Sequence, residues 1–314
     1  MKASYLVSYD QPGSLQYGEM PEPVLKKNSL LVQVKAVSVN PVDWKIRQGV
    51  LKLLQGSKFP RIIGSDFAGI VEEVAPGIDG FKAGDRIYGA IPAFSGKPGV
   101  LAEIANVNQK NVRAMPDWLS FEEAASLPIA ALTALNGLRR CSVLKGTRVL
   151  VNGATGGVGH FGVQAAKAIG AHVTATCSAG NTDLAIELGA DEVFGYSRDN
   201  TISMGIQFDA ILDAWGMMEH KEIYRLLKPE GIYASPLYMP WTIFPASWVR
   251  IRFGRKMTSS NMRKRPEDYD ELEALIEQKK LKPVIESEYP LEKSSEAFDK
   301  AEFGKPRGKV IIKV

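Results

Sequence analysis

The stretch Thr147-Arg-Val-Leu-Val-Asn-Gly153-Ala-Thr-Gly156-Gly-Val-Gly159 decides the fold of this 314-residue chain. Its first half, Arg148–Asn152, has the apolar run of a buried strand, and its second half is a glycine turn. The helix that follows, Val158–Ile169, ends at Gly170, and a second strand begins at His172. A strand, a helix and a strand within about thirty residues make a β-α-β unit, which indicates a parallel sheet.

The glycine turn predicts a dinucleotide site. Such a turn points backbone N–H groups and the positive end of a helix dipole at a pyrophosphate. Gly153 permits the tight turn, Gly156 lets the backbone approach the phosphates, and Gly159 lets the helix pack against the strand. A chance glycine turn in another α/β protein is the alternative, and the β-α-β context favours the dinucleotide site.

The end of the second strand indicates which dinucleotide binds. An NAD site usually carries an Asp or Glu there, which holds the ribose 2′-hydroxyl. This chain has no acidic residue from His160 through Thr182, and the strand ends in Thr176-Cys-Ser-Ala-Gly-Asn181. A carboxylate would repel a 2′-phosphate, whereas hydroxyl and amide groups can donate to it. We therefore expect NADPH.

Composition limits the other classes of function. A net charge of +4 gives no reason to expect nucleic acid as a partner, and no apolar run is long enough to span a membrane. The start of the chain lacks the apolar region of a signal peptide. Two cysteines, Cys141 and Cys177, make no disulfide framework and predict a reducing, cytoplasmic setting. Three scattered histidines show no ligand spacing, so no metal site is expected.

The pattern along the chain predicts two domains. Residues 1–116 are rich in short strands and glycine turns, which is typical of a compact barrel. A capping box at Ser120-Phe-Glu-Glu123 opens a helix, and strands and helices then alternate, as in a doubly wound parallel sheet. The final strand, Lys309–Val314, has no parallel partner unit of its own, so we expect the tail to return to the first domain. We therefore predict one domain from residues 1–116 and 266–314, with residues 117–265 inserted as the dinucleotide-binding domain.

The strands expected in this way fall into two sets. In the first domain they are Leu30–Val39, Phe67–Val74, Asp85–Ala90 and Val100–Val107, and in the second they are Arg148–Asn152, Val173–Thr176, Glu192–Gly195, Asp209–Asp213 and Gly231–Ser235. Helices are expected at Thr182–Leu188, Glu219–Leu227 and Asp268–Lys279, and one is expected to begin at Pro128.

Several motifs together resemble one family over essentially the whole chain. The chain resembles the zinc-free quinone oxidoreductase branch of the medium-chain dehydrogenase/reductase superfamily. The motifs are Ser38-Val-Asn-Pro-Val-Asp-Trp-Lys-Ile-Arg47, Pro60-Arg-Ile-Ile-Gly-Ser-Asp-Phe-Ala-Gly69, Phe81-Lys-Ala-Gly-Asp-Arg-Ile-Tyr-Gly89, Ala124-Ala-Ser-Leu-Pro-Ile-Ala-Ala-Leu-Thr133, the glycine turn, Leu188–Tyr196 and Gly308-Lys-Val-Ile-Ile312. The resemblance implies an α/β fold with a GroES-like β-barrel catalytic domain and an inserted Rossmann domain.

The resemblance also implies a reaction. Zinc-dependent relatives carry a catalytic Cys near positions 38–42 and Gly-His-Glu where this chain has Gly64-Ser-Asp66. Without a Lewis acid, alcohol oxidation is disfavoured, whereas hydride addition to a conjugated acceptor gives a delocalised anion. We expect a homodimer that transfers hydride from NADPH to a quinone, enone or enal, a small apolar electrophile held between the domains. The alternatives are an enoyl-thioester or NAD-linked carbonyl reductase, and a non-catalytic dinucleotide-binding protein with a structural or RNA-binding role.

Site residues follow from the matching positions. The resemblance implies that Thr133 lies beside the nicotinamide and that Asn40 faces the cofactor and the substrate. Asp43 and Lys45 are candidate catalytic residues in the same segment, and Lys45 can stabilise a developing enolate oxygen. The alternative for Asp43 and Lys45 is a surface ion pair, with water as the proton source. The implied cofactor contacts are Thr133, Gly153, Ala154, Thr155, Gly156, Gly157, Val158, Ser178, Asn181 and Tyr196.

One basic segment has two interpretations. It contains Arg250, Arg252, Arg255, Lys256, Arg263, Lys264 and Arg265. An anionic partner, either the cofactor phosphate or a membrane surface, is one interpretation, and a solvated face is the favoured one. The aromatic residues Trp241, Phe244, Trp248 and Phe253 can close over an apolar acceptor or serve as core or dimer contacts.

Overall fold

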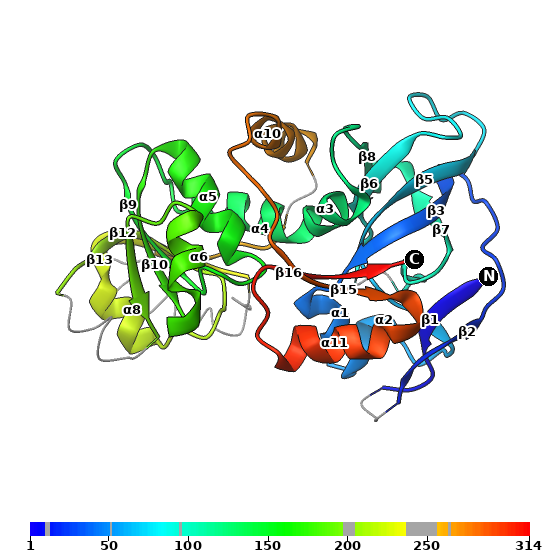
Figure 1. Ribbon diagram of the computed structural model, residues 1–314, viewed down its shortest axis with the longest axis horizontal. Coiled ribbons are helices and arrows are strands. Elements are labelled where there is room, and N and C mark those ends of the chain that lie inside the picture. Colours follow the sequence, from blue (N-terminus) through cyan, green and yellow to red (C-terminus); the bar gives the residue numbers. More distant parts are fainter. Residues whose placement is uncertain (10–12, 51, 94–95, 197–204, 237–255, 263–264) are drawn as a thin grey trace. The chain divides into compact units, whose positions relative to one another are not determined.

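Two compact units make up the protein. The computed structural model describes residues 1–9, 13–50, 52–93, 96–196, 205–236, 256–262 and 265–314. Unit 1 consists of Met1–Ile129 with Ile285–Val314, and unit 2 consists of Ala130–Val284 (Figure 1). Unit 1 therefore takes both ends of the chain, and unit 2 is an insertion in it. No described helix is both long and apolar enough to cross a membrane.

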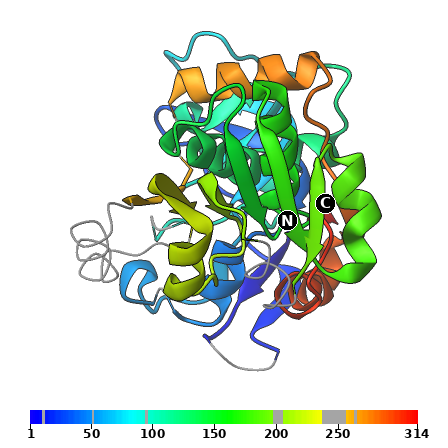
Figure 2. The same ribbon diagram turned by 90° about the vertical axis from the view of Figure 1, so that its left-hand side faces the viewer.

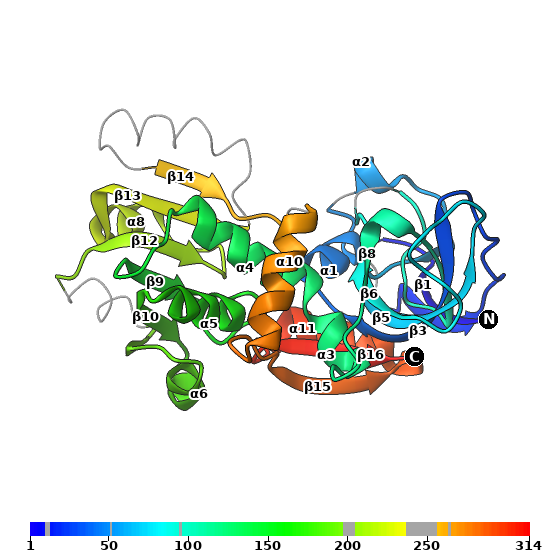
Figure 3. The same cartoon turned by 90° about the horizontal axis from the view of Figure 1, so that it is seen from above.

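The unit boundaries differ from the predicted 116/117 and 265/266. Helix α3 (Phe121–Ser126) packs on strands β3 (Ser29–Ser38) and β5 (Asp66–Val74), which places it in unit 1. Helix α10 (Pro266–Glu277) is tied instead to helix α4 (Pro128–Arg140), because the Arg139 guanidinium bonds to the carboxylates of Asp268 and Glu271. Figure 3 shows these two helices crossing. Side-chain contacts, which the spacing of residues does not reveal, therefore decide the boundaries.

Two sheets form unit 1. The larger one has the order β15-β16-β3-β5-β6-β8, with β7 also paired to β3, and the smaller one has the order β2-β1-β4. The strands are β1 (Lys2–Leu6), β2 (Leu15–Glu19), β3 (Ser29–Ser38), β4 (Arg61–Ile62), β5 (Asp66–Val74), β6 (Arg86–Ala90), β7 (Ile104–Asn108), β8 (Val112–Ala114), β15 (Ile285–Pro290) and β16 (Lys309–Lys313). The helices are α1 (Pro41–Arg47), α2 (Lys52–Gln55), α3 and α11 (Ser294–Phe303).

The tail returns to unit 1, as the sequence predicted. Strand β16 pairs antiparallel with β3, where Ile311 lies opposite Ser38. It also pairs parallel with β15, which the sequence analysis did not anticipate. The apolar residues of β16, Val310 and Ile312, join the core of unit 1 together with Phe298 of α11. Burial of these side chains holds the two ends of the chain together.

Unit 2 contains a six-stranded parallel sheet with the order β11-β10-β9-β12-β13-β14, seen face-on in Figure 2. The predicted strands are confirmed as β9 (Arg148–Asn152), β10 (His172–Cys177), β11 (Glu192–Gly195), β12 (Phe208–Asp213) and β13 (Leu227–Ser235). Strand β14 (Lys256–Ser259) completes the sheet, and the helices between strands include α5 (Gly159–Ile169), α6 (Thr182–Glu187) and α8 (His220–Leu226). The strand order reverses between β9 and β12, which is the usual position of a dinucleotide.

Alternating side chains of β12 bury both faces of this sheet. Leu212 packs on one face, where its methyl groups lie against Gly137 of α4 and Gly162 of α5. Ile211 points to the other face and joins a cluster with Ile223 of α8. Such a doubly covered parallel sheet is the predicted fold of the inserted domain.

Several predicted features lie outside the described residues. They are Arg250, Arg252, Arg255, Arg263, Lys264, Trp241, Phe244, Trp248 and Phe253. Of the basic segment, Arg265 is described, and its guanidinium bonds to the carboxylates of Asp268 and Glu267. Lys256 is exposed at the start of β14.

The β9–α5 turn leaves no room for a side chain at Gly159. A Cβ atom there would lie 2.0 Å from the Gly153 carbonyl oxygen. We expect Gly159→Ala to lower the free energy of unfolding by about 3 kcal/mol or more, since backbone must move. Gly195→Ala is the control, because a Cβ atom at Gly195 meets nothing within 4 Å. Urea denaturation compares the variants, and equal losses would contradict this account of the turn.

Candidate active site

The glycine turn of unit 2 presents backbone N–H groups at the carboxyl edge of the sheet. Gly153 has φ +79°, and the Gly153 and Ala154 amides donate to the Thr176 carbonyl oxygen at 3.1 and 2.9 Å. Within the described chain, the amides of Gly157 and Val158 have no hydrogen-bond partner. They precede the first turn of α5, so they suit the oxygens of a pyrophosphate.

Beneath the turn, a buried carboxylate joins the ends of neighbouring strands. Asp213, at the end of β12, accepts from Asn152 Nδ2 at 2.7 Å and from the Tyr233 hydroxyl at 2.7 Å. Asn152 Oδ1 in turn accepts from the Thr176 hydroxyl at 2.6 Å. Asp213 also accepts from the Gly216 amide at 2.9 Å, which fixes the loop after β12. The network holds the edge on which a dinucleotide would lie.

The residues expected near the adenosine ribose gather at the end of β10. Asn181 Nδ2 donates to the Thr155 hydroxyl at 3.2 Å, which joins that end to the glycine turn. The Tyr196 amide donates to the Cys177 carbonyl oxygen at 3.1 Å, and Ser178 is exposed beside it. Partial burial, with Cys177 and Asp213 adding to it, raises the pKa of Tyr196 to about 12. The phenol is therefore neutral at physiological pH.

In unit 1, Asn40 is fixed by four hydrogen bonds, three of its side-chain amide and one of its backbone. Its Nδ2 donates to Asp66 Oδ2 at 3.0 Å and to the Ser38 carbonyl oxygen at 3.1 Å, and its Oδ1 accepts from Lys309 Nζ at 2.6 Å. Its backbone N–H donates to Asp43 Oδ2 at 2.8 Å. Asn40 is 2% exposed, so its side chain is held in one orientation by its neighbours.

Three ionisable groups are buried around Asn40. Asp43 and Asp66 are fully buried, and Lys309 is 3% exposed. Burial raises the pKa of Asp43 to about 6 despite hydrogen bonds from Ser65 and Asn40. Burial likewise raises the pKa of Asp66 to about 7, and Lys309 acts against that rise. Burial lowers the pKa of Lys309 itself.

Asp66 and Lys309 are site residues that the sequence reasoning missed. Both lie in quoted motifs, yet only the fold brings β5 and β16 to the same amide. Asp66 also accepts from the Ile129 amide at 3.1 Å, in the first turn of α4. The same helix carries Thr133, which is buried in unit 2. The available signal was an Asp and a Lys within otherwise apolar strands, where charges are rare unless paired.

Lys45 does not form the surface ion pair that was the alternative to a catalytic role. Asp43 points into the buried cluster, where it accepts from the Ser65 hydroxyl at 2.7 Å. Residues two apart on a helix do not face each other, so Lys45 points elsewhere. Its Nζ lies 5.5 Å from the centroid of the Trp44 ring, and the described residues offer it no carboxylate. Partial burial lowers the pKa of Lys45.

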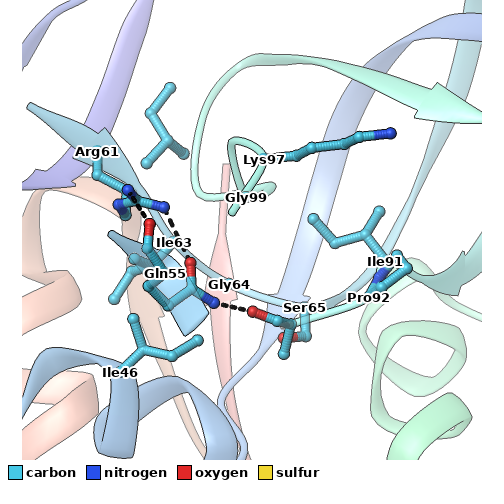
Figure 4. Close-up of a pocket in the computed structure, with 12 residues that line it drawn as sticks. Ile46, Gln55, Arg61, Ile63, Gly64, Ser65, Ile91, Pro92, Lys97 and Gly99 are labelled. Carbon is cyan, nitrogen blue, oxygen red and sulfur yellow. Dashed lines mark hydrogen bonds between the residues drawn. The ribbon is translucent and has the colours of Figure 1, made fainter. Parts of the chain in front are cut away.

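A pocket of about 250 Å³, which includes open solvent, adjoins this cluster in unit 1. Ile46 and Ile63 give it an apolar wall, and Ile91 lies on the opposite side (Figure 4). The Arg61 guanidinium donates to Gln55 Oε1 at 2.9 Å, so it is bonded within the pocket wall. Gln55, Ser65 and Lys97 add polar groups to the same lining.

The donor set of unit 1 does not suit a catalytic zinc ion. Ser65 occupies the position at which the zinc-dependent members of the resembled superfamily have His. Its hydroxyl donates a hydrogen bond to Asp43. No thiolate or imidazole lies near positions 38–42. Among the described residues, no group of three His, Cys, Asp or Glu side chains could hold a metal ion. Both cysteines are buried and free.

The chain is similar to known proteins over essentially its whole length. A family described as "Alcohol dehydrogenase GroES-like domain" matches residues 26–117, and one described as "Zinc-binding dehydrogenase" matches residues 188–312. The chain is 34% identical over 310 residues to the chloroplastic quinone-oxidoreductase homolog of Spinacia oleracea, covering 95% of this chain and 94% of the relative. It is 35% identical over 298 residues to 2-methylene-furan-3-one reductase of Solanum lycopersicum, covering 92% and 73%. The solved quinone oxidoreductase of Coxiella burnetii superposes with a TM-score of 0.93 at 30% identity, covering 100% and 99%.

The buried carboxyl of Asp66 should make stability depend on pH. Its folded pKa of about 7 exceeds the ordinary value of 3.8, so the folded state binds more protons between these values. Stability therefore falls as pH rises from about 4 to 7. We expect Asp66→Asn to remove on the order of 2–3 kcal/mol of the loss between pH 5 and pH 8.

Urea denaturation at both pH values measures this difference. The control Asp79→Asn alters an exposed aspartate and should keep the pH dependence of the unchanged protein. An Asp66→Asn variant with the same pH dependence as the unchanged protein would contradict the assignment.

Proposed function

The chain belongs to the zinc-free quinone oxidoreductase branch of the medium-chain dehydrogenase/reductase superfamily, and on that premise we propose that it reduces a quinone or an α,β-unsaturated carbonyl with NADPH. The observation that carries the proposal is Lys45, a half-buried ammonium with no carboxylate partner in the described chain. Beside a substrate it offers an uncompensated positive charge for an oxygen that becomes negative.

The choice of NADPH rests on the end of β10. No acidic side chain stands there, and Ser178 and Asn181 offer hydroxyl and amide donors. The neutral phenol of Tyr196 follows β11 and adds no negative charge. These groups support binding of a 2′-phosphate, which a carboxylate at the same edge would repel.

The choice of acceptor rests on the electrostatics of unit 1. A bound nicotinamide would supply the hydride, and the reduced acceptor would then carry negative charge on its oxygen. Lys45 can stabilise that oxygen and donate the proton that completes the reduction, and its lowered pKa favours donation. No metal is required, which agrees with the donor set at Ser65. The names of a spinach quinone-oxidoreductase homolog and a tomato furanone reductase also support this acceptor class.

Two further inferences accompany the proposal. We infer a reducing, cytoplasmic compartment, and the two buried free thiols support the reducing setting. We infer a homodimer without a nucleic-acid partner, on the basis of family resemblance and the small net charge of +4. Size-exclusion chromatography with light scattering measures the oligomeric state.

The reaction class is tested by following NADPH absorbance against a small panel. The panel contains a naphthoquinone, a linear enone, a long-chain enal, and a saturated alcohol offered with NADP. We expect oxidation of NADPH with at least one unsaturated acceptor and no reaction with the alcohol, because the donor set provides no Lewis acid. NADPH that binds but is consumed by no acceptor would favour the non-catalytic alternative, and thioester-only turnover would favour an enoyl reductase.

Lys45→Met tests the role of the ammonium. We expect kcat with the best acceptor to fall at least tenfold, about 1.4 kcal/mol, because the developing oxyanion loses its cation. The effect should be smaller for quinones than for enones, since a hydroquinone anion is better delocalised. The control is Lys27→Met, an exposed lysine whose loss should leave turnover unchanged. Turnover of Lys45→Met within threefold of the unchanged protein would leave water as the proton source.

Ser178→Asp tests the cofactor preference. A carboxylate at the end of β10 should weaken NADPH binding at least tenfold, whereas NADH binding should stay equal or improve. Ser178→Ala controls for loss of the hydroxyl alone. Isothermal titration calorimetry of the unchanged protein and both variants with NADPH and with NADH measures the six dissociation constants needed. An unchanged NADPH preference in Ser178→Asp would place the 2′-phosphate elsewhere.

A further inference from the structure

A buried arginine without a carboxylate partner lies in the wall of the unit 1 pocket. Arg61, on strand β4, is 8% exposed. Its guanidinium donates to Gln55 Oε1 at 2.9 Å, to the Gln55 carbonyl oxygen at 2.5 Å and to the Gly96 carbonyl oxygen at 3.2 Å. All three acceptors are neutral, and the described residues offer the guanidinium no carboxylate. A charge buried in this way is rare unless it is paired.

The guanidinium of Arg61 keeps unused donors along one edge. An arginine carries five N–H groups in a planar fork. Nη1 makes two of the bonds described above and Nη2 makes one, and the bonds to Gln55 are drawn in Figure 4. Nε is buried and has no hydrogen-bond partner in the described chain. The unused N–H groups therefore belong to Nε and Nη2, which are neighbours in the fork, and two neighbouring N–H groups match the two oxygens of a carboxylate.

The lining of the pocket carries positive charge. The described lining residues include two cations, Arg61 and Lys97, and no Asp or Glu. Lys97 is exposed, so solvent screens its charge more than that of Arg61. Asp43, which accepts from the Ser65 hydroxyl, is not part of the lining. A ligand with a negative group therefore suits this pocket better than a neutral one.

The apolar part of the lining restricts the kind of anion. Ile46, Ile63 and Ile91 line the pocket together with Arg61 (Figure 4). An inorganic anion would leave these side chains uncovered, whereas an organic carboxylate can cover them with its hydrocarbon part. The pocket therefore favours a molecule that joins a carboxylate to an apolar body.

The pocket shares helix α1 with the proposed proton donor. Ile46, in the lining, follows Lys45 directly on α1. Ser65, also in the lining, donates to Asp43 of the same helix at 2.7 Å. A ligand in the pocket therefore contacts the helix that carries the proposed catalytic ammonium.

We propose that Arg61 binds a carboxylate of the acceptor, so that the substrates are enones, enals or quinones that also carry a carboxylate. The inference rests on the proposed function, because it takes the ligand of the pocket to be the acceptor. A carboxylate is favoured over a phosphate because one guanidinium edge supplies two donors and balances one negative charge. Arg61 thus selects and holds the substrate, while Lys45 keeps the role of proton donor.

Isothermal titration calorimetry tests the carboxylate site without turnover. The probes are the saturated ketone obtained by reducing the double bond of benzalacetone para-carboxylate, and the methyl ester of that ketone. We expect the full-length protein to bind the carboxylate at least tenfold more tightly than the ester, because hydrogen bonds between charged groups are stronger than neutral ones. Arg61→Gln should abolish this preference. Arg61→Lys should keep part of it, since an ammonium retains the charge but not the planar pair of donors.

A matched control is available in the same unit. Arg86 also donates to backbone carbonyl oxygens, those of Asp117 and Leu119, and is not part of the pocket lining. Arg86→Gln therefore removes a comparable guanidinium and should leave the preference for the carboxylate unchanged. Thermal melting of each variant shows whether it is folded.

Steady-state kinetics with NADPH measure the same preference during turnover. The acceptors are benzalacetone para-carboxylate and its methyl ester. The ratio of their kcat/KM values, carboxylate over ester, should fall at least tenfold in Arg61→Gln, mainly because KM for the carboxylate rises. Comparing this ratio between proteins cancels the difference in intrinsic reactivity between the two acceptors.

The outcomes separate the inference from the proposed function. Equal affinity of the unchanged protein for the saturated carboxylate and its ester would overturn the inference and leave the proposed function intact. A folded Arg61→Gln variant that keeps the preference would do the same, and would leave Arg61 with the structural role of binding Gln55. If Arg61→Gln does not fold, the unchanged protein and Arg61→Lys decide. Absence of NADPH oxidation with every unsaturated acceptor would instead overturn the proposed function, while calorimetry would still measure the carboxylate site.

Discussion

A carboxylate that is buried away from water must receive hydrogen bonds. Each unit of this protein is organised around one such carboxylate. Asp66, at the start of β5, collects donors from Asn40 and from the first turn of α4. Asp213, at the end of β12, collects donors from Asn152, Tyr233 and the loop that follows it. An unbonded charge at either place would cost several kcal/mol, so the surrounding backbone has little freedom. The functional elements of each unit are positioned by this requirement.

This arrangement separates groups that hold the site from groups that remain free to act. Asn40 has both amide hydrogens bonded within unit 1, so its geometry suits a fixed wall. Lys45 differs, because its Nζ has no ionic partner in the described chain. Chemistry and recognition need side chains whose interactions are incomplete before the ligand arrives. The contrast is the physical basis for proposing Lys45 as the proton donor.

Most strands of unit 2 were predictable from the sequence, and much of unit 1 was not. A parallel β-α-β unit has a strong local signature, because glycines, an apolar strand and an amphipathic helix occur within one short segment. The strands of unit 2 were therefore placed closely, and the capping box at Ser120 correctly marked the start of α3. Strands β4 and β15 were missed, because pairing with distant strands, and not local propensity, makes them strands. The boundaries of the two units differ from the predicted ones for the same reason.

The sequence by itself determined the glycine turn, the missing carboxylate at the end of β10 and the missing zinc ligands, since each depends on which residue occupies one position. Only the tertiary structure decided the partners of the charged groups. Asp43 and Lys45 look like an ion pair in the sequence, but the helix turns Asp43 inward to Ser65 and leaves Lys45 without a carboxylate partner in the part of the chain that the structure describes. Lys309 reaches Asn40 across 269 positions of sequence. Electrostatic interactions depend on distance in space and on burial, and the linear order of residues specifies neither of them.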